Sequence, residues 1–171
     1  EPSVVDRSVY SIGFDGNNKK LISPEHGYTI ADFSNGGRYY MSIYSDANTP
    51  YVISINSSED GSVVRMIEDN KKVSDKMQEY GFVRKEFFKF KTSEGIELNG
   101  YMMKPSDMQP GKKYPVLMNV YGGPGSQQVL NTYSSFDMLW FEYLCSKGYV
   151  IACIDNRGTG GRGADFKNCT Y

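Results

Sequence analysis

A tyrosine beside a glycine-rich turn is the first candidate for chemistry in this sequence. Tyr121 follows the strand-forming run Pro115–Val120 and precedes the turn Gly122–Pro124. A phenol hydroxyl at such a strand end can donate a hydrogen bond to an oxyanion, the negatively charged oxygen that forms when a nucleophile attacks a carbonyl group. The spacing alone leaves a second interpretation open, in which Tyr121 packs under a loop.

A serine nucleophile is missing from this pattern. No Ser among the 171 residues lies within G-x-S-x-G, the strained turn that presents the nucleophile in α/β-hydrolases. The sequence therefore predicts a part of a catalytic site, and we expect the chain by itself to be inactive.

Two glycine-rich segments imitate nucleotide-binding motifs. Gly158–Gly163 fits G-x-G-x-x-G and follows an apolar strand, but the acidic residue that confirms a dinucleotide site would lie past Tyr171. Gly122–Gly125 lacks the Lys-Ser/Thr ending of a phosphate-binding loop. Nucleotide binding is therefore disfavoured, and a tight turn that leaves Tyr121 exposed is favoured.

The cysteines and the histidine do not form a metal-binding pattern. Cys145, Cys153 and Cys169 lack the spacing of zinc ligands, and His26 is the one histidine that could join them. Cys145 falls in a helix-like segment and Cys153 in a strand-like one, so both are predicted to be small core residues. His26 is predicted to lie on the surface, and we expect neither a metal nor a cofactor.

The composition excludes partners that require a strong charge. Lys and Arg number 19 against 20 Asp and Glu, a net charge of −1, so we expect neither nucleic acid nor an anionic membrane as a partner. Aromatic residues make up 14% of the chain, and Arg38–Tyr44 shows the alternation of a half-buried strand. The composition favours β structure.

The first part of the chain is predicted to form antiparallel hairpins. Short β-forming segments alternate with turn residues, including the pairs Asp15–Gly16 and Asp60–Gly61. The hairpins that carry these pairs, residues 9–23 and 51–68, are offset by about 42 to 45 residues, the spacing of four-stranded propeller blades. An ordinary antiparallel sheet is the alternative.

The pattern changes after a predicted short helix at Lys71–Tyr80. Two further strands are expected at residues 84–91 and 96–103, joined by a turn at Thr92–Gly95.

A β-α-β unit is predicted next. Its strands are Val116–Tyr121 and Tyr149–Ile154, and the helix between them begins near Ser134 or Ser135 and ends at Gly148. The apolar residues of this helix fall at helical spacing: Phe136, Leu139, Trp140, Tyr143 and Leu144. The two strands should pair in parallel and, being continuously apolar, should be covered on both faces.

Several motifs together resemble the dipeptidyl peptidase IV family of prolyl-cleaving serine peptidases. They are Phe33–Ser34 with Tyr39–Tyr40, Ile67–Asn70, Lys113–Pro115, Val120–Gln127 and Asp155–Gly160. The specific part is the tyrosine-glycine motif in its strand context, followed by the aspartate-arginine-glycine turn.

The resemblance implies a mixed fold that spans the junction of two domains. Residues 1–80 would be the C-terminal part of a β-propeller, and residues 81–171 the N-terminal part of an α/β-hydrolase domain, truncated before its nucleophile. Tyr121 would be the oxyanion donor, and the turn Asp155–Arg157 would be structural. The family's Ser, Asp and His would follow this segment, since all three come later in the α/β-hydrolase order.

The implied activity is that of a serine exopeptidase that releases N-terminal Xaa-Pro dipeptides by acyl-enzyme chemistry. The partners would be peptides with proline near the N-terminus, the full-length protein would be a homodimer, and a secreted, periplasmic or cell-surface location is favoured. One alternative is a non-catalytic α/β-hydrolase-like module, and another is a related prolyl tripeptidyl peptidase or oligopeptidase. Because unpaired sheet edges are expected, the chain should be marginally stable or self-associating.

Overall fold

The chain forms two compact units in the computed structural model, which describes residues 3–133 and 135–170. The first unit comprises residues 1–80 and 131–133, and the second comprises residues 81–130 and 134–171. A single boundary between residues 80 and 81 was expected from the sequence. In the structure, the short segment 131–133 also belongs to the first unit. Long-range hydrogen bonds, described below, account for this difference.

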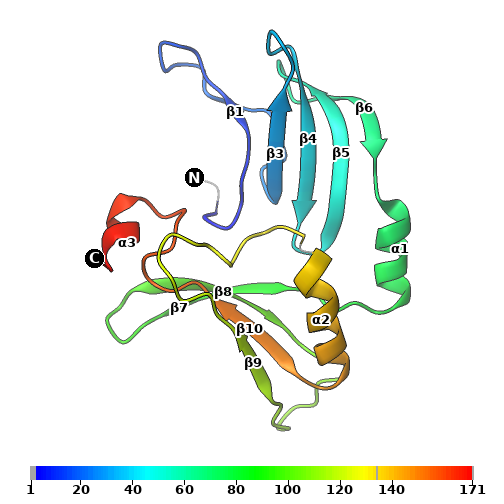
Figure 1. Cartoon of the computed structure of the whole chain (residues 1–171), viewed down its shortest axis with the longest axis vertical. Helices are drawn as coiled ribbons and strands as arrows, with labels where there is room; N and C mark the ends of the chain where they lie inside the picture. Colours follow the sequence, from blue (N-terminus) through cyan, green and yellow to red (C-terminus); the bar gives the residue numbers. More distant parts are fainter. Residues whose placement is uncertain (1–2, 134, 171) are drawn as a thin grey trace. The chain divides into compact units, whose positions relative to one another are not determined.

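A four-stranded antiparallel sheet dominates the first unit (Figure 1). Its strands, in spatial order, are β3 (Tyr28–Phe33), β4 (Tyr39–Asp46), β5 (Thr49–Ser57) and β6 (Val63–Glu68). A separate short hairpin pairs β1 (Tyr10–Ser11) with β2 (Lys20–Leu21). The helix α1 (Lys71–Glu79) follows β6, close to the range predicted from the sequence. The antiparallel hairpins expected from the turn residues are present.

Turn chemistry and one buried tyrosine explain this sheet. Gly36 and Gly37, between β3 and β4, adopt φ angles of 79° and 67°, which glycine accepts without strain. Tyr40 is almost fully buried, and its hydroxyl donates a hydrogen bond to the carbonyl of Ile22. The Tyr40 ring also packs against Phe33, with centroids 5.4 Å apart. The side chain thus ties the sheet to the segment that precedes it.

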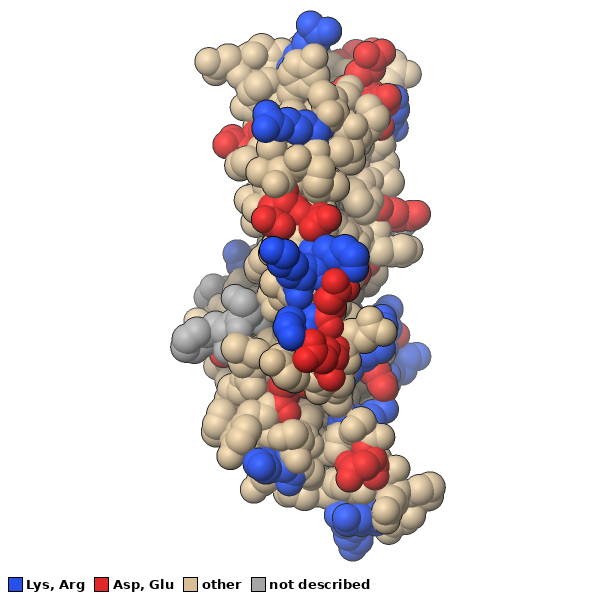
Figure 2. Space-filling model, turned by 90° about the vertical axis from the view of Figure 1, so that its right-hand side faces the viewer, with Lys and Arg blue, Asp and Glu red and all other residues tan. Residues whose placement is uncertain are grey.

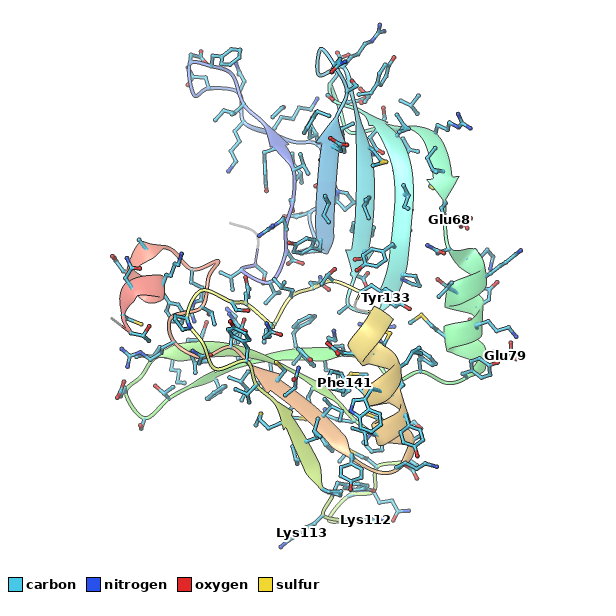
Figure 3. All side chains as sticks on the ribbon, viewed as in Figure 1. Glu68, Glu79, Lys112, Lys113, Tyr133 and Phe141 are labelled. Atoms are coloured by element: carbon cyan, nitrogen blue, oxygen red, sulfur yellow. The ribbon has the colours of Figure 1, made fainter. Side chains whose placement is uncertain are left out.

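The segment Asn131–Tyr133 is bound to the first unit by its own hydrogen bonds. The Asn131 amide group donates to Asp6 Oδ1 at 2.7 Å and accepts the backbone N–H of Ala47 at 2.9 Å. The Tyr133 carbonyl accepts the Tyr51 hydroxyl at 2.6 Å, and the two rings meet edge to face. Tyr133 is labelled in Figure 3, just before the first turn of the helix that follows it. These contacts assign the segment to the sheet of β3 to β6.

A mixed four-stranded sheet forms the second unit. Its strands, in spatial order, are β7 (Glu86–Lys91), β8 (Glu97–Met103), β10 (Val150–Ile154) and β9 (Val116–Asn119). The β7–β8 and β8–β10 pairs are antiparallel, and β9 and β10 pair in parallel. The helix α2 (Ser135–Ser146) connects β9 to β10, and α3 (Ala164–Asn168) follows β10. The predicted β-α-β unit is confirmed.

The core of the second unit lies between α2 and the sheet. Phe141, labelled in Figure 3, and Cys145 from α2 pack with Met103 of β8 and Ile151 of β10. Gly148 ends the helical segment with a φ of 83°, as expected for a left-handed C-terminal residue. The expected cap at Ser134 or Ser135 lies outside the residues whose side chains are described.

One expectation about β9 is wrong. The strand was expected to be covered on both faces, but Val116, Met118 and Val120 are 59%, 51% and 57% exposed. The opposite face is partly buried, and its Leu117 packs against the core. The continuous apolar run at β9 was therefore a misleading indication of burial on both faces, because such a run does not identify the element that covers the second face.

The fold class is mixed α/β, with mostly antiparallel sheets and few helices. No helix among the described residues is long and apolar enough to cross a membrane. On the face that Figure 2 presents, basic and acidic side chains are interspersed, in keeping with the net charge of −1.

Candidate functional site

Tyr121 lies on the loop between β9 and α2, two positions past the last residue of the strand. Its side chain is 62% exposed. Gly122 adopts a φ of 75°, and the tyrosine ring lies so close to Gly123 that a Cβ there would come within 2.7 Å of Cε1. Among the described residues, none forms a hydrogen bond with the Tyr121 hydroxyl. The hydroxyl is therefore free to donate to a ligand.

The far end of the same loop is held by a buried carboxylate. Asp155 immediately follows β10 and is 6% exposed. Its Oδ1 accepts the backbone N–H of Gln128 at 2.7 Å, and both carboxylate oxygens lie 3.2 Å from the N–H of Val129. The Asp155 N–H in turn donates to the Asn99 carbonyl at 3.0 Å. The carboxylate thus joins the β9–α2 loop to the end of β10.

The electrostatics of Asp155 reflect this position. Burial raises the pKa of the carboxyl above its usual range, while the hydrogen bonds from Gln128 and Val129 oppose the rise.

The second glycine-rich segment packs against this loop. The Gly125 N–H donates to the Gly158 carbonyl at 2.8 Å, and a Cβ at Gly161 would come within 2.7 Å of Gln127 Oε1. The glycines therefore permit a close approach of two loops, one after each of the parallel strands.

The end of that segment does not offer a nucleotide-binding helix. The helix α3 has only five residues, and Gly163, the N-cap residue before it, supplies no side-chain cap. Arg162 donates to the Glu97 carbonyl and lies over the Phe166 ring at 3.9 Å. The observed contacts of this motif are packing contacts within the second unit.

No family model matches this chain. Dipeptidyl peptidase 4 of Trichophyton equinum is 35% identical over 167 residues, which cover 95% of this chain and 21% of that protein. Dipeptidyl peptidase 4 of Trichophyton rubrum is 35% identical over 170 residues, with the same two coverages. The crystal structure of dipeptidyl peptidase 4 of Porphyromonas gingivalis matches with a TM-score of 0.93 and 44% identity, over 100% of this chain and 24% of that one.

The chain belongs to the dipeptidyl peptidase 4 family. It spans about a fifth of the length of the curated relatives that it matches, since it covers 21% of them. The resemblance read from the sequence motifs is confirmed. The role of Tyr121 stays a prediction, because neither the fold nor the similarity tests it.

Within this dipeptidyl peptidase 4 segment, the two most specific motifs lie side by side. The Tyr121 loop follows β9, the turn at Asp155–Gly160 follows β10, and the two strands are parallel neighbours. Parallel strands bring their carboxyl ends to one edge of the sheet, which is where open α/β sheets bind ligands. The structure thus brings together residues that are 34 positions apart in sequence, Tyr121 and Asp155.

The remaining candidate residues from the sequence are His26 and the three cysteines. His26 has a side chain that is 77% exposed, and its Nδ1 lies 3.6 Å from a carboxylate oxygen of Asp6. Cys145 and Cys153 are buried, and burial raises the pKa of both thiols to about 11, so neither is a reactive thiolate. Cys169 is exposed. Among the described residues, no cluster of His, Cys, Asp and Glu could hold a metal ion.

Sequence reasoning missed the buried contacts of this region. It assigned Asp155 to a structural turn without a partner, and it gave Asn131 no role. The signal at Asp155 was an acidic residue directly after a buried strand, where a carboxylate needs hydrogen-bond donors. Nothing local to Asn131 identified it, because its partner Asp6 is 125 residues away in sequence.

Proposed function

We propose that this chain is part of a serine exopeptidase that releases N-terminal Xaa-Pro dipeptides from peptides. In this proposal, residues 1–80 belong to a β-propeller and residues 81–171 begin an α/β-hydrolase domain. The observation that carries it is the exposed Tyr121 hydroxyl on the β9–α2 loop, at the carboxyl end of a parallel strand. Family membership and the close match to a dipeptidyl peptidase 4 structure support it.

The position of Tyr121 agrees with the architecture of α/β-hydrolases. In that fold, the loop between the third strand and the first helix contributes a donor to the oxyanion hole. In the second unit, β9 is the third strand along the chain and α2 is the helix that follows it. Tyr121 lies on the corresponding loop.

The chemistry requires a donor at this place. When a serine oxygen attacks the scissile carbonyl, the carbonyl oxygen gains negative charge, and a phenol hydroxyl already aimed at it stabilises the charge more than the neutral substrate. The amine then leaves with a proton from a general acid, and water hydrolyses the acyl-enzyme. The serine, its base and the second oxyanion donor would come from other parts of the full-length protein.

The peptide specificity is the finer part of the proposal. The relatives are named dipeptidyl peptidase 4, and we extend to this chain a preference for dipeptides with proline in the second position.

The test is the turnover of a chromogenic Xaa-Pro amide by the full-length protein and its Tyr121→Phe variant. Loss of one oxyanion donor should lower kcat by about 100- to 1,000-fold with little change in KM. The matched control is Tyr143→Phe, which removes the hydroxyl of another exposed tyrosine, on α2, and should leave kcat unchanged. Absence of turnover by the wild type, or equal kcat for Tyr121→Phe, would overturn the proposal.

A further inference from the structure

We infer that Asp155 is a positioning residue that holds the β9–α2 loop so that the Tyr121 hydroxyl faces the oxyanion. This inference rests on the proposed function of Tyr121. Asp155 does not touch the tyrosine, and it acts through the backbone of the loop that carries it.

The first argument is the geometry of the carboxylate. Asp155 binds two consecutive backbone N–H groups, those of Gln128 and Val129, at 2.7 and 3.2 Å. A single carboxylate that accepts successive amides fixes the direction of the peptide plane between them, which a single hydrogen bond does not. The loop is therefore oriented at this point as well as attached.

The second argument is the cost of burying the charge. Among the described residues, no Lys or Arg forms an ion pair with Asp155, although it is 6% exposed. Arg157, two residues later, pairs with Glu94 at 2.8 Å instead. An apolar residue at position 155 would avoid the desolvation of a carboxylate, but it would leave the buried Val129 amide and the partly buried Gln128 amide without this acceptor. The carboxylate is suited to holding this loop rather than to neutralising a cation.

The third argument is that the loop has two attachment points, both on the segment that follows β10. Asp155 accepts the backbone N–H groups of Gln128 and Val129, and the side chain of Val129 is fully buried. The Gly158 carbonyl holds the N–H of Gly125 at 2.8 Å. Tyr121 is only four positions before Gly125, so the free length of loop between the attached part and the tyrosine is short.

The consequence concerns the reach of a phenol donor. An oxyanion donor acts at roughly 2.7 to 3.1 Å from the oxygen, so a small displacement of the loop removes the contact. A misplacement of about 1 Å by a change distant from the chemistry can cost about a hundredfold in rate. Loss of the Asp155 carboxylate should therefore reduce catalysis without altering any group that touches substrate.

The experiment is a double-mutant cycle in the full-length protein, with kcat and KM measured on a Xaa-Pro amide. Asp155→Asn preserves the size of the side chain, but it removes the negative charge and places an NH2 group against the Val129 N–H, where Oδ2 now accepts at 3.2 Å. We expect kcat to fall by roughly 10- to 100-fold with KM within about twofold. In the Tyr121→Phe background, the same change should lower kcat by less than about twofold, because the donor that Asp155 positions is already gone.

Two controls distinguish a positioning role of Asp155 from a general loss of structure. Arg157→Gln alters the same turn by removing the ion pair with the exposed Glu94, and it should leave kcat unchanged. Thermal melting identifies variants that are unfolded at the assay temperature. If Asp155→Asn does not fold, Asp155→Glu keeps the acceptor but lengthens the side chain, and the same loss of kcat and the same non-additivity are expected of it.

The outcomes distinguish this inference from the proposed function. An inactive wild type, or a Tyr121→Phe variant with normal kcat, overturns the proposed function and this inference with it. If Tyr121→Phe is impaired as expected but the Asp155 variants keep normal kcat, only the inference is overturned. It is also overturned if the effects of the two sites multiply, since Asp155 would then act independently of Tyr121.

Discussion

The ring of Tyr121 lies against the backbone of Gly123, where a Cβ would come within 2.7 Å of the ring. Gly123 does not have a positive φ, so its side chain is excluded by the tyrosine and not by backbone strain. Gly123 thus leaves room for the aromatic ring of the residue two positions before it.

Gly123→Ala should therefore displace the tyrosine. In the full-length protein we expect kcat on a Xaa-Pro amide to fall by about 10- to 100-fold, because the donor leaves its position. The matched control is Gly160→Ala, since Gly160 also lacks a positive φ and its Cβ would meet the nearest atom only at 3.5 Å. Normal kcat in Gly123→Ala would show that the tyrosine position is not catalytically important.

Asn131→Ala should destabilise the sheet of β3 to β6. The change leaves the buried Ala47 N–H without an acceptor and removes a donor from the buried Asp6 carboxylate. The expected loss is about 2 to 4 kcal/mol of unfolding free energy. Hydrogen exchange of the amides in β4 and β5 measures this loss, and the Ala47 amide should lose protection first. Asn35→Ala, in an exposed turn, is the control; equal protection in the two variants would contradict the prediction.

Glu142 on α2 should make stability depend on pH. Burial raises the pKa of its carboxyl, although the Val83 N–H donates to Oε2 at 3.0 Å, and Oε1 is buried without a hydrogen-bond partner among the described residues. A raised folded-state pKa means that the folded chain favours the protonated form. Its contribution to stability is fully present below the unfolded-state pKa and is lost as pH rises through the folded-state pKa.

Glu142→Gln is expected to remove this dependence while keeping an acceptor for Val83. Urea unfolding at several pH values, followed by the fluorescence of Trp140 on the same helix, should show a smaller fall in stability from acidic to neutral pH than in the wild type. Glu25→Gln, at an exposed carboxylate, serves as the control. If the wild type and Glu142→Gln have parallel pH profiles, the burial of Glu142 has no such effect.

The uncovered face of β9 should drive self-association of the 171-residue chain. Val116 and Met118 on β9, the strand at the edge of its sheet, and Val120 just after it expose apolar surface. We expect sedimentation velocity to show association that increases with concentration, and Met118→Lys to reduce it. Met108→Lys, at an exposed loop methionine, should not. A monomeric wild-type chain at all concentrations would refute the prediction.

Local sequence patterns predicted most of the helices and strands, but they could not predict contacts between residues far apart in the sequence. The glycines of the β3–β4 turn, the helix α1 and the parallel pairing of β9 with β10 follow from turn chemistry, spacing and apolar runs. Tyr121 could be proposed as a site residue because its residue type and its place at a strand end are both local features, and its role stays a prediction. Asp155 was noticed for its position, but its partners Gln128 and Val129 became visible only when the two loops were placed together. The same reason explains why the pairing of Asn131 with Asp6 was missed.

The path of the chain through residues 131–133 has a consequence for how such a protein can be recombined. The chain enters the first unit, leaves it at residue 80, and returns for three residues before resuming the second unit at residue 134. A single genetic crossover at residue 80 between two distant homologues would join a sheet from one parent to the Asn131 segment of the other. Asp6 and Asn131 must then be inherited as a matched pair, although most of the gene segment lies between their codons.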